Sequence, residues 1–178
     1  KIDVSQLGLL YAGAQKNIGP AGVTLVIIRE DILGAINRKI PAMMNYKTHI
    51  EKNSMFNTPP VMAIYAVNRS LVWLKNIGGV DSIENKNKLK AEKLYNEIER
   101  NPLFVSPIAK EDRSIMNVPF IFSNGEDEEE FLSFCPDRGL RTIKGHRSVG
   151  GFRASIYNAM PEAGVDALIQ AMKDYESR

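Results

Sequence analysis

The sequence has few of the residues that mark specialised classes of protein. Cys135 is the only cysteine among 178 residues, so the chain forms no internal disulfide, which favours a reducing compartment such as the cytoplasm. No apolar run approaches the roughly 20 residues that a membrane-spanning helix needs. Lys1 and Asp3 are followed by a mixed segment and not by the apolar stretch of a signal peptide. We therefore expect a cytoplasmic protein without a membrane anchor.

A large excess of one charge is also missing. The chain has 23 Lys and Arg against 21 Asp and Glu, which gives a net charge of +2. Nucleic acids and acidic membranes attract proteins that carry a large basic excess on one face, so neither is an expected partner. With 44% apolar and 25% charged residues, the composition is that of a globular protein with one domain or slightly more.

Two apolar runs near the N-terminus predict β-strands. Residues 9–12 and 23–28 are short, and the second run is continuous and β-branched, which is typical of strands buried on both faces of a mostly parallel sheet. The connection at 13–22 holds three glycines and a proline. This composition predicts a sharply shaped turn close to the sheet.

The next segment predicts a long loop and then a helix. Residues 35–60 lack periodicity, and loops of this length are usually functional or disordered. Residues 61–74 are apolar almost all round, which predicts a helix enclosed by its neighbours, with Trp73 in the core. Gly78 and Gly79 then predict the end of that helix.

The remainder of the chain has the pattern of an ordinary α+β domain. The predicted elements are an amphipathic helix at 85–100, a strand at 118–122, a helix opened by a capping box of Asp127 and Glu130, a strand at 151–156, and a final helix through Val165, Leu168, Ile169 and Met172. The change in character near residues 78–81 predicts two domains, at 1–79 and 80–178.

Lys16 is the first candidate for chemistry. A lysine in a glycine-rich turn between two apolar strands is expected to have its amine in a low-dielectric site, where burial favours the neutral, nucleophilic form. The alternative is an ordinary surface lysine in a loop. A phosphate-binding loop of the nucleotide type is a weaker alternative, because that motif needs Gly-Lys followed by Ser or Thr, and the order here is Gln15-Lys16-Asn17.

A second candidate is the segment 141–153, which has four cations and His146 in a stretch containing glycines. Arginine binds carboxylate or phosphate through paired hydrogen bonds, so Arg147 and Arg153 predict a site for a doubly anionic small molecule. The alternative is a solvated basic loop. For His146 the alternatives are a packed histidine or a metal ligand, and no second ligand cluster near it supports a metal.

The third candidate is the segment 53–60, which places Asn57 and Thr58 directly before the predicted helix. An amide, a hydroxyl and the free N–H groups of a helix start can bind a phosphate. The alternative is that both residues only cap the helix and form a turn.

These candidates lie in three long motifs that occur in order. The motifs are YAGAQKNIGPAGV at 11–23, NSMFNTPP at 53–60 and KGHRSVGGFRASIYNAMP at 144–161. Together with MNVPF at 116–120, they resemble the phosphoserine aminotransferases, pyridoxal-phosphate enzymes of the class V aminotransferase family. The resemblance extends over essentially the whole chain.

The resemblance implies an α/β fold of the fold-type I pyridoxal-phosphate-dependent transferases. Residues 1–79 would be the end of the large cofactor-binding domain, including the end of its sheet, and residues 80–178 the small α+β C-terminal domain. The implied reaction transfers an amino group between O-phospho-L-serine and 2-oxoglutarate, giving 3-phosphooxypyruvate and glutamate in serine biosynthesis. The implied assembly is a homodimer with sites shared across its interface.

The resemblance also assigns the candidate residues to roles at the cofactor. Lys16 would attach covalently to the aldehyde of pyridoxal 5'-phosphate and carry the proton between the substrate α-carbon and the cofactor. Asn57 and Thr58 would bind the cofactor phosphate in the site of the partner subunit.

The other candidates receive roles at the substrate. Arg153 would bind the substrate α-carboxylate, and His146 and Arg147 would bind the substrate phosphate across the dimer interface.

In this family the cofactor-binding domain begins well before the lysine, so the chain is expected to be the C-terminal half of the enzyme and inactive alone. Two alternatives stay open. One is a non-catalytic module that binds small phosphorylated anions or mediates dimerisation, and the other is a different class V aminotransferase.

Overall fold

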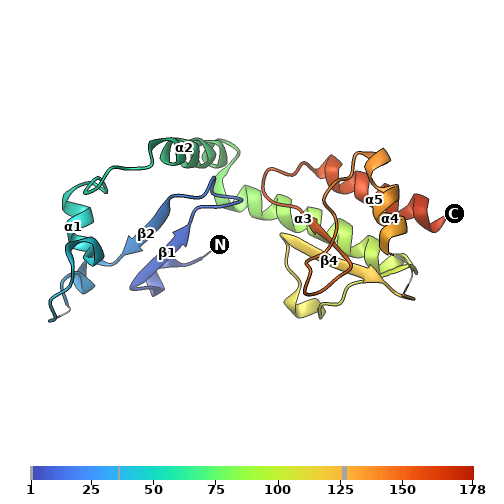
Figure 1. The fold of residues 1–178 in the computed structure, drawn as a ribbon, viewed down its shortest axis with the longest axis horizontal. Helices are drawn as coiled ribbons and strands as arrows, with labels where there is room; N and C mark the ends of the chain where they lie inside the picture. Colours follow the sequence, from blue (N-terminus) through green and yellow to red (C-terminus); the bar gives the residue numbers. More distant parts are fainter. Residues whose placement is uncertain (1, 36, 126–127) are drawn as a thin grey trace. The chain divides into compact units, whose positions relative to one another are not determined.

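The computed structural model describes residues 2–35, 37–125 and 128–178 (Figure 1). The chain divides into two compact units, a first unit of residues 1–80 and a second unit of residues 81–178. Within the described ranges, no helix is both long enough and apolar enough to cross a membrane.

A two-stranded sheet opens the first unit. Strands β1 (Leu9–Gly13) and β2 (Thr24–Ile28) pair in antiparallel register, with Leu9 opposite Ile28 and Gly13 opposite Thr24. The prediction of a parallel arrangement is therefore wrong for this pair. Parallel neighbours need a crossover of a dozen or more residues, and the connection here is shorter than that.

Burial on both faces of these strands is also not observed. Tyr11 and Ile27 are 72% and 53% exposed. The continuous apolar run correctly predicts a strand. The other elements of this unit do not cover both faces of the two-stranded sheet to which it belongs.

The helices of the first unit are α1 (Tyr46–Glu51) and α2 (Val61–Asn76). The predicted long loop therefore contains a short helix, which begins where the Asn45 side chain accepts a hydrogen bond from the backbone N–H of Lys47. Helix α2 ends at Asn76, close to the predicted stop. It buries only Val67, and Trp73 is 42% exposed, so the predictions of an enclosed helix and a core tryptophan are wrong within this chain.

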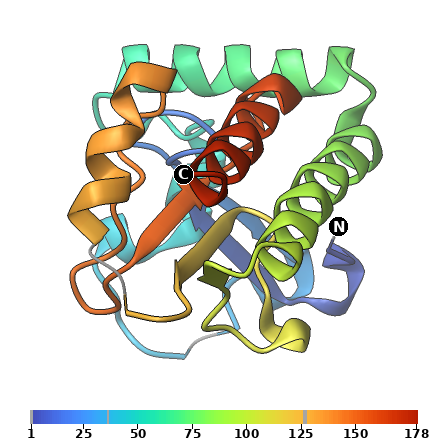
Figure 2. The same cartoon turned by 90° about the vertical axis from the view of Figure 1, so that its right-hand side faces the viewer.

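The second unit packs three helices and a three-stranded antiparallel sheet (Figure 2). Its main elements are α3 (Gly79–Arg100), β3 (Phe104–Val105), β4 (Asn117–Phe122), α4 (Glu128–Phe134), β5 (Phe152–Ser155) and α5 (Glu162–Glu176). The strand order is β3-β4-β5. These elements confirm the helices and strands predicted for this part of the chain, except that Asp127 of the predicted capping box lies outside the described residues.

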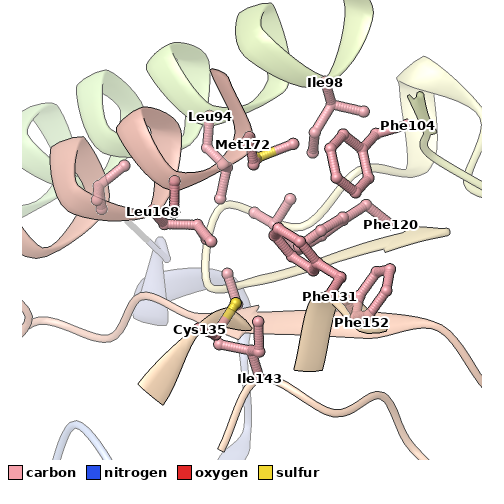
Figure 3. Close-up of a cluster of buried hydrophobic side chains, with 14 of the residues drawn as sticks. Leu94, Ile98, Phe104, Phe120, Phe131, Cys135, Ile143, Phe152, Leu168 and Met172 are labelled. Carbon is pink, nitrogen blue, oxygen red and sulfur yellow. The ribbon is translucent and has the colours of Figure 1, made fainter. Parts of the chain in front are cut away.

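Alternation along β4 separates the two faces of this sheet. Val118, Phe120 and Phe122 are buried, while the residues between them are only partly covered. The buried side chains meet an aromatic cluster in which the rings of Phe120 and Phe152 have centroids 5.1 Å apart, as do those of Phe131 and Phe152. Figure 3 shows this core. Its other labelled members are Leu94, Ile98, Phe104, Cys135, Ile143, Leu168 and Met172.

A buried lysine ties α3 to the turn after β5. The Lys90 ammonium donates hydrogen bonds to the carbonyl oxygens of Ile156, Tyr157 and Met160 at 3.2, 2.9 and 3.0 Å. Lys90 is 3% exposed, and burial lowers the pKa of its ammonium. Three carbonyls thus satisfy the three donors of one ammonium and hold the chain immediately after the strand that carries Arg153.

Glu97 is a second buried charge on α3, and its pairing predicts a pH-dependent stability. Its carboxylate accepts hydrogen bonds from Arg100 Nη2 at 2.7 Å and Asn101 Nδ2 at 3.2 Å. Burial alone would raise the pKa of Glu97, but these hydrogen bonds and the nearby positive charges outweigh it and hold the pKa below its ordinary value of 4.5. The carboxylate therefore stabilises the fold fully above pH about 4.5, and this stabilisation is lost as pH falls through the lower folded-state pKa.

We expect Glu97→Gln to lower the free energy of unfolding by about 2 kcal/mol at pH 7, because the hydrogen bonds from Arg100 and Asn101 lose their charged acceptor. The difference from wild type should shrink as pH falls below about 4.5. Urea unfolding followed by circular dichroism at pH 7 and pH 3 measures both values. Glu92→Gln, at an exposed position of the same helix, is the control. An equal destabilisation by Glu97→Gln at both pH values would contradict the assignment.

Candidate functional site

Lys16 lies in the connection between β1 and β2. The backbone N–H of Ala14 donates to the carbonyl of Val23 at 2.7 Å and continues the strand pairing, and that of Ile18 donates to Gln15 at 3.1 Å and closes a turn around the lysine. Lys16 has φ of +53°, which is rare for a residue with a side chain. The predicted sheltered amine is not observed, since Lys16 is exposed in this chain. The elements of the first unit leave this side chain uncovered.

Two glycines place this connection against α2. A Cβ at Gly19, where φ is +147°, would lie 3.1 Å from a methyl group of Val67, and a Cβ at Gly22 would lie 3.6 Å from that of Ala63. The close approach leaves little space for a side chain at Gly19, whose φ also favours glycine. The turn that carries Lys16 therefore rests on a helix.

Asn57 and Thr58 are exposed in the segment directly before α2. The Asn57 amide donates to the backbone carbonyl of Thr58 at 3.3 Å. The residue at the N-cap of α2 is Pro60, and no side chain caps the helix. The prediction that these two residues cap the helix is therefore wrong, while the Asn57 hydrogen bond to Thr58 is a local contact of the kind found in turns.

In the second unit, residues 143–153 form a tight hairpin on the free edge of β5. The backbone N–H of Gly145 donates to the carbonyl of Gly151 at 2.7 Å, and that of Arg153 donates to Ile143 at 2.7 Å. A Cβ at Gly145 would overlap the carbonyl oxygen of Gly150, so only glycine fits there. The hairpin tip, defined here as residues 146–150, is thereby presented as a short turn.

His146 and Arg147 are exposed on this hairpin tip. His146 Nδ1 lies 2.7 Å from Ser148 Oγ, and the backbone N–H of Ser148 points to the same nitrogen at 3.3 Å. Its Nε2 has no such contact with Ser148. The tip thus combines an imidazole and a guanidinium in adjacent residues, which suits a phosphate.

Arg153 lies on β5 opposite Pro119 of β4. Its neighbours Phe152 and Ala154 are buried in the core, so by strand alternation Arg153 belongs to the face away from that core. Its Nε atom is buried, and none of the described residues accepts a hydrogen bond from it. A cavity of about 410 Å³ adjoins it, bounded by residues 139–143, β5 and the start of α5.

A buried guanidinium N–H without a partner is costly, and an anionic ligand would remove this cost. Arg153 is therefore suited to bind a carboxylate that is not part of the chain.

Backbone strain gathers in the first two motifs and in the basic segment 141–153. Within the described residues, the non-glycine residues with positive φ are Lys16, Asn53, Ser54 and Thr142. Lys16 lies in the first motif, Asn53 and Ser54 lie in the second, and Thr142 lies in the basic segment 141–153. Strained conformations of this kind persist where the surroundings hold them, and they concentrate at functional sites.

The candidates are divided between the two units. Lys16, Asn57 and Thr58 belong to the first unit, and His146, Arg147 and Arg153 belong to the second. Among the residues that the structure describes, no group of three or more His, Cys, Asp or Glu side chains is arranged to hold a metal ion.

Sequence reasoning missed Lys90 as a buried residue of α3. Leu89 is 47% exposed, whereas Lys90 is buried on the same face as Leu94. The spacing of four residues between Lys90 and Leu94 indicates a shared helix face. Because lysines are rarely buried, the charge of Lys90 argued against a place in the core.

Comparisons with known proteins agree with this picture. The family model for class V aminotransferases matches residues 1–168. A phosphoserine aminotransferase of Parabacteroides distasonis is 54% identical over 179 residues, which covers 99% of this chain and 50% of that protein.

Two solved structures show the same fold. Phosphoserine aminotransferase from Bacillus circulans subsp. alkalophilus matches with a TM-score of 0.90 and 43% identity, over 99% of this chain and 49% of that one. The pyridoxal-phosphate-bound enzyme from Trichomonas vaginalis matches with a TM-score of 0.86 and 45% identity, over 97% of this chain and 49% of that one. The chain thus spans about half the length of the relatives it matches. It has the partial fold of a fold-type I pyridoxal-phosphate-dependent transferase and belongs to the class V aminotransferase family.

Proposed function

We propose that the protein is a pyridoxal-phosphate-dependent phosphoserine aminotransferase, which exchanges an amino group between O-phosphoserine and 2-oxoglutarate in serine biosynthesis. Class V membership and a relative of this name at 54% identity support the reaction. The observation that carries the substrate class is the hairpin of residues 143–153. It combines a buried, unpartnered Arg153 Nε with an exposed imidazole and guanidinium at its tip.

In this proposal the first unit is the end of the cofactor-binding domain and contributes three residues to the cofactor site. The Lys16 amine would hold the cofactor at its aldehyde carbon, the aldehyde oxygen leaving as water, and would carry the proton at the substrate α-carbon. Asn57 and Thr58 bind the cofactor phosphate in the site of a second copy. Pyridoxal phosphate, when bound, supplies the ring that accepts the electron pair left at the substrate α-carbon.

The donors present in this chain suit the cofactor. The exposed Lys16 amine, on a strained turn, suits the aldehyde of the cofactor. The Asn57 amide and the Thr58 hydroxyl, directly before a helix, suit its phosphate. Because Lys16 is exposed within the first unit, its shelter must come from other surfaces of the working protein.

The second unit, the small domain of this proposal, handles the substrate. Arg153 binds the α-carboxylate, and its buried Nε gains the acceptor that the chain does not supply. His146 and Arg147 bind the substrate phosphate in the site of the partner copy. The substrates are thus small anions that need two separate cationic contacts.

A homodimer fits the surface of the first unit. Large apolar side chains are exposed along α2, where Val61, Met62 and Tyr65 are 66%, 76% and 60% exposed. Large apolar side chains that are exposed next to one another suit an interface. A cytoplasmic location is proposed as well, since Cys135 is a free thiol. Its burial in the core raises its pKa to about 11.

Arg147→Ala in the full-length protein tests the substrate class. We expect kcat/KM for O-phosphoserine to fall by about 10- to 100-fold, since a charged hydrogen bond to the phosphate is lost. Turnover of unphosphorylated serine, however slow, should be unchanged. Steady-state assays with both donors measure the difference, and Lys144→Gln, an exposed charge on the same hairpin, is the control.

Equal losses of activity for both donors would contradict the phosphate assignment and favour another class V aminotransferase. A second candidate function is the non-catalytic anion-binding module, which the exposure of Lys16 favours. Tight binding of O-phosphoserine without any turnover in the full-length protein would support that candidate instead.

A further inference from the structure

We propose that Glu128 is a positioning residue for phosphate recognition, because it holds the base of the hairpin tip that carries His146 and Arg147. This inference rests on the proposed function for its substrate, but the contact itself is present in the chain. Glu128 is the first residue of α4 and lies 23 positions before its partner in the hairpin.

The contact is a charge-assisted hydrogen bond to a buried backbone group. Glu128 Oε1 accepts from the backbone N–H of Gly151 at 2.8 Å. Gly151 is buried, so its N–H would lack water as a substitute partner if the carboxylate were removed. The same carboxylate oxygen lies 3.6 Å from the position that a Cβ on Gly150 would occupy. Glu128 therefore contacts Gly150, the last residue of the tip, and Gly151, which follows it.

Gly151 cannot easily move away from this contact. Its φ is +62°, and a Cβ there would lie 2.7 Å from the carbonyl oxygen of Phe120, so the backbone is held in a conformation and a space that suit glycine. Its own carbonyl accepts from the Gly145 N–H at 2.7 Å. Glu128 thus fixes one end of a turn whose two ends are bonded to each other.

The neighbouring Glu129 makes a different kind of contact. It pairs with Lys144 at 2.8 Å on the same hairpin, but the two side chains are 71% and 67% exposed. Solvent-exposed ion pairs contribute little, whereas a buried N–H that loses its acceptor pays the full desolvation cost. Two adjacent glutamates thus reach the same hairpin, and only Glu128 is expected to determine the position of its tip.

A fixed tip matters because the donors of His146 and Arg147 must be placed before the substrate phosphate arrives. Side chains held in position lose less freedom on binding, so affinity rises without any additional contact. Glu128 does not touch the substrate in this account. It acts through the backbone of the tip.

The test compares Glu128→Ala, Glu128→Gln and Glu129→Gln in the full-length protein loaded with pyridoxal phosphate. We expect Glu128→Ala to raise KM for O-phosphoserine about 10-fold while kcat and the KM for glutamate stay within about twofold. Glu128→Gln should recover most of the affinity, because its amide oxygen accepts the same N–H. Glu129→Gln should behave as wild type.

A second readout is independent of catalysis. Hydrogen exchange of the Gly150 and Gly151 amides should accelerate at least about 10-fold in Glu128→Ala and remain unchanged in Glu129→Gln. Equal KM increases for both substrates, or unchanged exchange in Glu128→Ala, would overturn the positioning role. If the wild-type protein shows no turnover, the proposed function fails, while isothermal titration with O-phosphoserine and the exchange data still decide whether Glu128 positions an anion-binding tip.

Discussion

Replacing Lys16 with alanine is expected to lower transamination by the full-length protein by at least about 10³-fold. The amine is proposed to act both as the covalent attachment point of the cofactor and as the group that moves the proton, and either role alone accounts for a large share of the rate. The strained backbone of Lys16, with φ of +53°, is the local observation that favours a functional role for this position. Steady-state assay with O-phosphoserine and 2-oxoglutarate measures the effect.

Borohydride reduction provides a readout that does not depend on turnover. Reduction in the presence of pyridoxal phosphate, followed by peptide mapping, should place the label on Lys16 and on no peptide in Lys16→Ala. Lys75→Ala, at an exposed lysine on α2, is the matched control and should keep both label and activity. Label distributed over several surface lysines, or none at all, would refute the assignment of Lys16 and favour the anion-binding module.

Phe152→Ala is expected to destabilise the second unit by about 3–5 kcal/mol. Phe152 has no exposed surface and lies within 5.1–5.2 Å, between ring centroids, of Phe120, Phe122 and Phe131. Removing its ring leaves a cavity at the centre of an aromatic cluster that is fixed by three strands and a helix, so the surroundings relax only in part. The same substitution alters the strand that presents Arg153, and the affinity for the substrate should fall as well.

Hydrogen exchange of the β4 amides measures this loss directly, because it reports on the second unit. The single tryptophan, Trp73, lies in the first unit and would report elsewhere. Val105→Ala, at a 43% exposed position of the neighbouring strand β3, should cost less than about 1 kcal/mol. Similar losses for Phe152→Ala and Val105→Ala would show that the aromatic cluster is not the centre of the core.

The second unit follows the sequence pattern closely. The strand predicted at 118–122 is β4, and the helix predicted at 85–100 is part of α3. These elements bury one face within the unit itself, so alternation or helical spacing along the sequence matches the burial that the fold provides. The burial predicted from the sequence agrees with the observed burial because the apolar faces of these elements pack against one another within the same unit.

The first unit departs from its pattern for the same physical reason. The continuous apolar runs of β2 and α2 predict burial on all sides, yet Ile27 and Met62 are exposed. The runs identify strand and helix correctly, but periodicity contains no information about which surfaces cover them. The direction of the pairing depended on the length of the connection, which is too short for a parallel crossover.

The sequence by itself determined the motifs, the family resemblance and the residue types suited to a cofactor and a doubly anionic substrate, because these depend on the order of residues along the chain. Tertiary structure decided which functional side chains are buried and which hydrogen-bond partners position them. The buried Arg153 Nε, the Lys90 ammonium bound by three carbonyls and the Glu128 contact with Gly151 all join positions distant in sequence or depend on burial. Such contacts produce no periodic pattern in the sequence. Their contribution depends on burial in the folded protein, where a polar group without a partner would lose its hydrogen bonds to water.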